Sequence, residues 1–286
     1  MQMSSECIGC VLGSTFDLMI KQLPPEKHEM LVRDMLEIAK QQNWQESPPE
    51  FARKLYDFLR EAGGDADSFA AAKQQSTRLA LQLLPEMRQF AHASSDPFGS
   101  IVKAVIGGNI IDCGVDRSLN IAQAIEELKE VFAMPLDESA IREFEKHFYR
   151  AESIFYMLDN CGEAVLDRLL LEKFSGKITL GVRGGCVLND ITRAELQESG
   201  LADYPVFDTG DTTPGVSLKR SNKEFINAMR SADLVIAKGQ GNYETLDIYD
   251  RPIVHLLRLK CPVVSRTARQ ERGSLALIMR NMPALD

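Results

Sequence analysis

The sequence predicts an α/β protein in which a helical N-terminal part precedes a mostly parallel sheet with helices on both faces. In the first 150 residues, apolar side chains recur at helical spacing, and proline or glycine interrupts them. From residue 151, short apolar runs alternate with helical segments, as in sheets whose parallel strands are joined by helices. We therefore expect a helical domain at residues 1–150 and an α/β domain at residues 151–286.

Prolines, glycines and capping residues mark the ends of the helices expected in the first part. Pro24-Pro25 ends the first helix, and Gly63-Gly64 ends the third. Asp67 or Ser68 caps the fourth, and Asp96-Pro97 begins the fifth. The expected helices are Val11–Leu23, Glu26–Gln42, Pro48–Leu59, one reaching Phe90, one containing Ile106, Ser118–Phe132 and Glu138–Arg150.

In the second part, each expected strand is a short apolar run and each expected helix follows one. The expected strands are Ile154–Leu158, Ile178–Val182, Val206–Asp208, Leu234–Ala237 and Pro262–Ser265. The expected helices are Glu163–Phe174, Arg193–Ser199, Lys223–Ser231, Glu244–Tyr249 and one near Ser274–Arg280. A parallel sheet of this kind places its ligand site at the carboxyl ends of the strands.

The composition argues against several classes of protein. The chain of 286 residues has a net charge of −8 and a pI near 5.2, whereas nucleic-acid-binding surfaces are usually basic. It contains no long uncharged apolar run, which argues against a membrane-spanning helix, and it does not begin like a signal peptide. We therefore expect a cytoplasmic protein that binds neither nucleic acid nor membranes.

Cys7 and Cys10 form the only C-x-x-C motif in the chain. Four interpretations remain open: a redox pair, half of a zinc site, a disulfide, or two thiols on one helical turn. A zinc site would need further ligands from elsewhere in the fold, such as Cys113, Cys261 or a histidine. Because the pair is far in sequence from the strand-end residues described below, we expect it to lie outside the catalytic centre.

Two polar pairs follow the first two expected strands. Asp159-Asn160 comes directly after the run F-Y-M-L, and Asn189-Asp190 comes shortly after the run that ends at Arg183. The carboxyl ends of parallel strands share one edge of the sheet, so these side chains are expected to meet. Asp159, Asn160 and Asp190 offer hard oxygen donors, which suit Mg²⁺ or Mn²⁺. The alternative is that these residues serve as loop and helix-cap residues.

Lys238 follows the fourth expected strand and precedes the turn G-Q-G-N. Its ammonium group and the backbone amides of the turn form a candidate phosphate site. The alternative is a solvated lysine beside a flexible turn. Arg183 is either a further donor in the cleft or part of a structural ion pair. A metal ion and a lysine together would neutralise the charge that develops in phosphoryl transfer.

Other catalytic motifs are absent from the sequence. There is no G-x-S-x-G and no G-x-x-x-x-G-K-[ST], and the first strand of the second part does not lead into G-x-G-x-x-G. These absences argue against an α/β-hydrolase, a P-loop NTPase and a dinucleotide-binding or methyltransferase site of the Rossmann type. The four histidines show no metal-ligand spacing.

Several motifs, taken in order, resemble those of the damage-control phosphatases, long described as a domain of unknown function. They are L-D-N-C-G-E, V-R-G-G-C-V-L-N-D-I-T, D-T-G-D-T-T-P-G and A-D-L-V-I-A-K-G-Q-G-N-Y-E-T-L, with the C-x-x-C and G-G-N-I-I-D before them. The set spans nearly the whole chain and is similar to the compact microbial subgroup that carries the cysteine pair. The chain departs from that pattern at Cys186, where a proline is more usual, and we expect this change to leave the metal site unaffected.

The resemblance implies a helical part packed on a Rossmann-like sheet and metal-dependent hydrolysis of phosphate monoesters, such as sugar phosphates or damaged metabolites. The divalent metal, Mg²⁺, Mn²⁺, Co²⁺ or Ni²⁺, would bind Asp159, Asn160 and Asp190. The substrate would contact Asn109, Lys238, Gly239, Gln240, Gly241, Asn242 and Lys260. Simple topology conflicts with the role of Lys260, because the fifth expected strand begins just after it and would place it at the opposite edge of the sheet.

Two other functions remain open at this stage. A carboxyl methyltransferase activity that uses S-adenosylmethionine has been attached to one branch of the family, and the missing glycine fingerprint ranks it second. A metal-dependent sensor of phosphorylated metabolites, with the same pocket and no turnover, ranks third. For the phosphatase and for the sensor, the expected partner is a small phosphorylated molecule.

Overall fold

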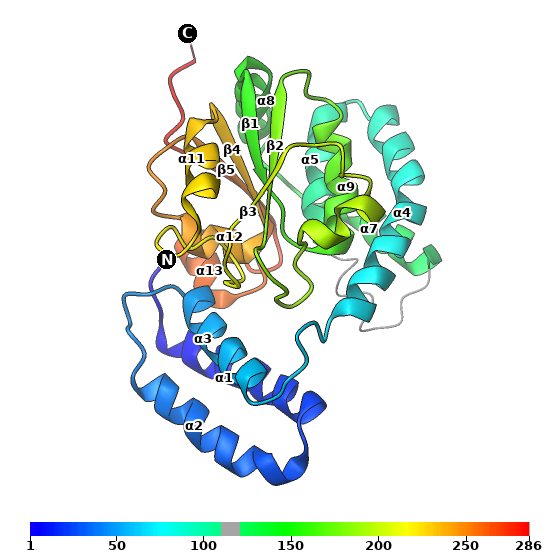
Figure 1. Cartoon of the computed structure of the whole chain (residues 1–286). Coiled ribbons are helices and arrows are strands. Elements are labelled where there is room, and N and C mark those ends of the chain that lie inside the picture. The colour runs from blue at the N-terminus through cyan, green and yellow to red at the C-terminus, as the bar shows by residue number, and fades with distance from the viewer. Residues whose placement is uncertain (110–120, 286) are drawn as a thin grey trace.

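The computed structural model describes residues 1–109 and 121–285, without the side chains of residues 121 and 122. Ile110 to Gly114, which include Cys113, and the expected helix start at Ser118 therefore lie outside the described residues. Within the described chain, helices cover both faces of a six-stranded sheet, as predicted (Figure 1).

The sheet confirms the predicted α/β class. Its strand order is β3-β2-β1-β4-β5-β6, and neighbouring strands are parallel except for β5 and β6. The chain winds from β1 out to β3 and then crosses to β4, so the connections diverge between β1 and β4. Open α/β sheets bind ligands at the carboxyl ends of the strands at such a point. The strands are β1 (Ser153–Met157), β2 (Lys177–Val182), β3 (Val206–Asp208), β4 (Leu234–Lys238), β5 (Ile253–Arg258) and β6 (Leu275–Arg280).

The helices lie in two arrangements around this sheet. They are α1 (Ser5–Gln22), α2 (His28–Lys40), α3 (Pro48–Glu61), α4 (Ala70–Ala93), α5 (Pro97–Gly107), α7 (Ile121–Ala133), α8 (Glu138–Arg150), α9 (Cys161–Leu171), α10 (Leu196–Ser199), α11 (Lys223–Ser231), α12 (Gly239–Leu246) and α13 (Pro262–Ala268). Helices α1, α2 and α3 share a hydrophobic core with Val263 of α13 and lie below the sheet in Figure 1, at the end where α12 and α13 lie. Among the described residues, no helix is long and apolar enough to cross a membrane.

The remaining N-terminal helices pack against the sheet. Alternate residues of β1 point to opposite faces. Ile154 and Tyr156 join α4, α5 and α9 in the largest core, while Phe155 and Met157 pack with Phe225 of α11 on the other face. Helices α4 and α5 thus share a core with the α/β part, and the division of the chain at residue 150 stays a prediction.

Three elements near the C-terminus differ from the prediction. β5 is absent from the predicted strands, Pro262–Ala268 is a helix where a strand was expected, and Leu275–Arg280 is a strand where a helix was expected. Pro262 suits the first turn of a helix, because proline lacks only a hydrogen that the first turn does not use. The apolar run L-A-L-I-M-R is too short for its spacing to separate a buried strand from a helix.

His255, in the middle of β5, is fully buried, and its ring packs edge-on against Tyr243 at 5.1 Å between centroids. Neither ring nitrogen has a hydrogen-bond partner among the described residues. Burial, with a smaller effect of Arg280, lowers the pKa of His255 to about 3. The ring is therefore neutral in the folded protein between pH 5 and pH 7.

We expect His255→Leu to reduce the loss of stability in mild acid. Between pH 7 and pH 5 the unfolded chain protonates this histidine, with a pKa near 6.5, whereas the folded chain does not, which costs folding about 2 kcal/mol. Urea unfolding at both pH values should therefore give a free-energy difference about 2 kcal/mol smaller in His255→Leu than in the wild type. His92→Leu, at an exposed position of α4, is the control. If the free energy of unfolding changes equally with pH in the wild type and in His255→Leu, His255 is not held neutral in the folded protein.

Candidate active site

A cavity of about 560 Å³ lies at the carboxyl edge of the sheet, between the strand ends and helices α1 and α3. This volume is within the usual range of small-molecule sites. Lys238 and Asn242, which the sequence placed in the site, do not line it. The predicted site residues that do line it are Asn109, Asp159, Asn160, Asp190, Gly239, Gln240, Gly241 and Lys260.

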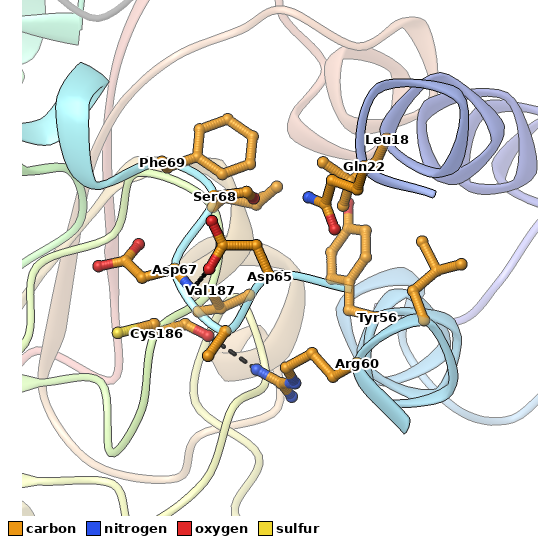
Figure 2. Close-up of a pocket in the computed structure, with 13 residues that line it drawn as sticks. Leu18, Gln22, Tyr56, Arg60, Asp65, Asp67, Ser68, Phe69, Cys186 and Val187 are labelled. Carbon is orange, nitrogen blue, oxygen red and sulfur yellow. Dashed lines mark hydrogen bonds between the residues drawn. The ribbon is translucent and has the colours of Figure 1, made fainter. Parts of the chain in front are cut away.

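Two further cavities contain none of the predicted site residues in their described lining. One, also about 560 Å³, lies beside α5 and α8 and is lined in part by Asp96, Phe98 and Glu138. The other, about 30 Å³, lies between α1, α3 and two loops, and Figure 2 shows it. There Arg60 donates to the Cys186 carbonyl at 2.8 Å and ties α3 to one of these loops. This smaller pocket is far below the size of a metabolite site.

Main-chain pairing brings Asp190 beside Asp159 and Asn160. Asp159 follows β1, and its carbonyl accepts a hydrogen bond from the Ile191 amide at 2.8 Å. Asn160 and Asp190 form an isolated antiparallel bridge. Asn160 is the N-cap residue of α9, yet its side chain makes no capping bond and lines the cavity. The structure therefore brings the three predicted metal ligands together and does not use Asn160 as a side-chain cap.

Arg183, at the end of β2, holds both carboxylates from within the protein. Its Nε donates to Asp190 Oδ2 at 2.6 Å, its Nη2 to Asp159 Oδ1 at 3.3 Å and its Nη1 to Asn242 Oδ1 at 2.9 Å. The side chain is only 1% exposed and does not line the cavity. Of the two roles open for Arg183, the structure supports the structural ion pair. The arginine fixes one oxygen of each carboxylate, and the second oxygen of Asp159 accepts from Asn160 Nδ2 at 3.3 Å.

Lys238 has a different position from the one predicted, because its side chain is fully buried. Its Nζ donates to Glu163 Oε1 at 2.5 Å, to Asp167 Oδ1 at 2.8 Å and to the Val105 carbonyl at 3.1 Å. An ammonium group has three hydrogens, so none is left for a phosphate. Although burial lowers it, the two carboxylates raise the pKa of Lys238 above its ordinary value. Lys238 is therefore a positioning residue for Glu163.

Glu163, which the sequence analysis did not include in the site, lines the cavity. Its second oxygen accepts from Asn109 Nδ2 at 3.2 Å, and the Asn109 Oδ1 has no partner among the described residues. Asp167, one turn further along α9, also accepts from the Tyr156 hydroxyl at 3.0 Å, and burial raises its pKa to about 7. The signal in the sequence is the spacing of Glu163 and Asp167, which places two acids on one face of a helix.

The charges around Asp159 fit a divalent cation. Burial, followed by repulsion from Asp190 and Glu163, raises the pKa of Asp159 well above its usual range. Burial also raises the pKa of Asp190, although Arg183 opposes the shift. Four buried carboxylates share only two buried cations, which leaves two negative charges in excess when all are ionised. The carboxylates are Asp159, Glu163, Asp167 and Asp190, and the cations are Arg183 and Lys238.

The ligand set that would hold such a cation combines two carboxylates with an amide. Among the residues that the structure describes, no three His, Cys, Asp or Glu side chains form a metal-binding group. The predicted set depends instead on Asn160, whose amide oxygen is a ligand of the same hard type as a carboxylate. Asp159, Asn160 and Asp190 therefore suit Mg²⁺ or Mn²⁺ better than softer metals.

Gly239 allows the first turn of α12 to approach Asp159 closely. Its φ is +77°, and a Cβ at this position would lie 1.9 Å from Asp159 Oδ2. Gly241 is similarly restricted, because its Cβ would lie 2.1 Å from the Pro214 carbonyl oxygen. The backbone amides at the start of α12 lack helical acceptors and can bind an anion. Asn242 takes no part in this, since it is fully buried and its amide donates to the Leu158 and Lys238 carbonyls.

Lys260 lies at the same edge of the sheet as Asp159. β5 ends at Arg258 and runs parallel to β4, so Lys260 follows the carboxyl end of a strand. The topological conflict found in the sequence came from expecting a strand after Lys260 instead of before it. Lys260 is exposed and lines the cavity.

The cysteine pair also lines the cavity, so it is nearer to the site than its distance in the sequence suggested, and its place outside the catalytic centre stays a prediction. Cys7 and Cys10 are free thiols on α1, and Cys261, at the start of α13, lies on the same lining. Burial, followed by the neighbouring Cys261 and Cys7, raises the pKa of Cys10. A raised pKa is the opposite of what an activated thiolate requires. The structure thus favours free thiols over a disulfide.

Comparisons with known proteins agree with these motifs. The profile of the damage-control phosphatase ARMT1-like domain matches residues 3–275. A damage-control phosphatase of Pyrococcus horikoshii is 31% identical, with 98% of this chain and 99% of that protein covered. A damage-control phosphatase of Archaeoglobus fulgidus is 28% identical, with 93% and 95% covered. The crystal structure of a DUF89 family protein from P. horikoshii matches with a TM-score of 0.87 at 29% identity, covering 99% of this chain and 100% of that one.

We expect Lys238→Met to destabilise the fold. Removing the ammonium leaves Glu163 and Asp167 buried without their cation, which typically costs about 3–5 kcal/mol. Urea unfolding at pH 8, above the Asp167 pKa of about 7, gives the change in free energy. Lys146→Met, at an exposed position of α8, should change stability by less than about 0.5 kcal/mol. If Lys238→Met is as stable as Lys146→Met, Lys238 does not form the buried ion pairs with Glu163 and Asp167.

Proposed function

The chain belongs to the damage-control phosphatase ARMT1-like family, and on this basis we propose that it is a metal-dependent phosphatase of small phosphorylated metabolites. The observation that carries the proposal is the meeting of Asp159, Asn160 and Asp190 at the strand crossover, where four buried carboxylates surround two buried cations. The two relatives from P. horikoshii and A. fulgidus are named damage-control phosphatases, and these names support the phosphatase activity. The metal and the substrate class are our proposal from the geometry.

Asp159, Asn160 and Asp190 would hold the divalent cation on the cavity side. When bound, the cation supplies Lewis-acid polarisation of a phosphoryl oxygen and offsets negative charge in the transition state. Arg183 fixes the two carboxylates through one oxygen each, so they do not have to reorganise when the substrate enters. Preorganisation of this kind lowers the cost of binding charge in a buried site.

The start of α12 and Lys260 would hold the phosphate. Gly239 lies beside Asp159, and Gly239 to Gly241 line the cavity at the positive end of the helix. Lys260 lines the same cavity and adds a point charge for a phosphoryl oxygen. Glu163, fixed by Lys238 and Asn109, lies on the same lining and can accept a hydrogen bond from an attacking water.

Asp159→Asn should abolish most of the activity while keeping the fold. The variant loses a negative charge at the cation with little change of shape, and we expect kcat/KM on p-nitrophenyl phosphate with Mn²⁺ to fall at least about 100-fold, or about 2.7 kcal/mol. Calorimetry should show weaker Mn²⁺ binding in parallel. Asp250→Asn, exposed on the surface and paired with Arg230, is the control. Wild-type kinetics in Asp159→Asn would show that the cation does not bind at this site. Binding of Mn²⁺ and of the ester without phosphate release in the wild type would instead indicate a sensor.

Lys260→Met should weaken the use of phosphate esters, whereas Lys260→Arg should restore only part of it, because the planar guanidinium differs in shape. A charged hydrogen bond to phosphate is worth at least about 1.4 kcal/mol, so kcat/KM is expected to fall at least about tenfold. Steady-state kinetics on fructose 6-phosphate at saturating Mn²⁺ measures the effect, with Lys146→Met as the control. Unchanged kcat/KM would show that the phosphate is held by the α12 amides alone.

A further inference from the structure

The connection between β5 and β6 carries two arginines on the cavity lining, Arg258 and Arg272. The two sides of this connection pair through main-chain hydrogen bonds, Leu259 N to Ser274 O at 3.0 Å and Gly273 N to Leu259 O at 2.6 Å. Arg258 Nε donates to the Gly273 carbonyl at 3.3 Å, and Arg272 Nε donates to the Lys260 carbonyl at 2.8 Å. Each guanidinium is therefore anchored through Nε to the opposite side of the connection.

Neither arginine has an acidic partner among the residues that the structure describes, although the chain carries a net charge of −8. Arg266, on the neighbouring helix α13, does pair with a carboxylate, that of Glu6. The terminal nitrogens of Arg258 and Arg272 make no hydrogen bond to the described residues. An arginine anchored through Nε presents its remaining N–H groups as a fork that matches a phosphate or a carboxylate.

The sheet sets the separation between these arginines and the proposed cation site. Asp159 follows β1, whereas Arg258 ends β5, two strands away, and Arg272 precedes β6, three strands away. Neighbouring strands lie about 4.8 Å apart, so the backbones of the two regions are about 10–14 Å apart along the sheet edge. Lys260 starts from the same connection and would have to extend its side chain to reach a phosphate beside Asp159, whereas the two guanidinium groups are tied through Nε to the connection itself. The cavity lining extends over both regions.

We propose that Arg258 and Arg272 bind a second anionic group of the substrate, at the end opposite the phosphate that is hydrolysed. The substrate class is an elongated phosphate ester with a phosphate or a carboxylate about 10 Å from the scissile phosphate. This inference rests on the proposed phosphatase function and adds a specificity determinant to it. The arginines select the substrate, and the residues around Asp159 act on it.

The test compares matched substrates with and without the second anion. One pair is fructose 6-phosphate and fructose 1,6-bisphosphate, and the other is glucose 6-phosphate and 6-phosphogluconate, each measured with Mn²⁺. In the wild type, kcat/KM should be at least about tenfold higher for the doubly anionic member of at least one pair. The pair that shows the preference identifies the second anion as phosphate or carboxylate. A ratio near one for both pairs would overturn the inference.

Arg258→Met and Arg272→Met should each lower the kcat/KM ratio of the preferred pair, and the double variant should bring it close to one. Arg251→Met is the matched control, because Arg251 lies at the other end of β5, at the opposite edge of the sheet. It should keep the wild-type ratio. A wild-type ratio in the double variant would overturn the assignment of these two arginines.

Calorimetric titration of the same four compounds separates this inference from the proposed function. If no compound releases phosphate, the phosphatase proposal fails, and binding still decides the role of the arginines. Tighter binding of a doubly anionic compound by the wild type, lost in the double variant, would support the second anion site. Equal affinity for both members of each pair, or no loss in the double variant, would overturn it.

Discussion

The arrangement of the candidate active site depends on the buried ion pairs of Arg183. Asp159 and Asp190 come from separate segments, and both lie in a region of low exposure where two carboxylates repel each other. Arg183 bonds to both and to Asn242 of α12, so one side chain connects the ends of β1 and β2 with the start of the helix after β4. Removing Arg183 would cost several kcal/mol, because Asp159 and Asp190 would both lose their buried cation.

A second buried group supports the opposite side of the site. Lys238 holds Glu163 and Asp167 of α9, and it also bonds to the Val105 carbonyl at the end of α5. The strand that ends beside Gly239 is thus joined to the two helices that cover this face. Both cations are enclosed, while the carboxylates around them remain in excess. On the cavity lining, Asp159, Glu163 and Asp190 lie near the ends of β1 and β2, and Arg258, Lys260 and Arg272 lie near β5 and β6.

The sequence predicted much of the fold and the identity of the strand-end residues. Asp159, Asn160 and Asp190 follow apolar runs that are recognisable as strands, and the crossover pattern implies that such ends share an edge. The C-terminal elements were predicted less well. Five apolar residues followed by Arg280 fit either a buried strand or a helix, and pairing with β5 in the tertiary structure decided the outcome for Leu275–Arg280. The unpredicted strand β5, which ends before Lys260, decided the edge of the sheet at which Lys260 lies.

The sequence by itself determined which chemical groups follow each strand, because hydrophobic runs and the residues after them are local properties. Only the tertiary structure decided which of those groups face the cavity. Lys238 shares a face of β4 with Leu234 and Ile236, so its side chain enters the core beside α9, where two acids neutralise it. Cys7 and Cys10 reach the cavity because α1 packs with α3 and α13, below the sheet in Figure 1. Packing between distant segments sets both positions, and no local pattern encodes it.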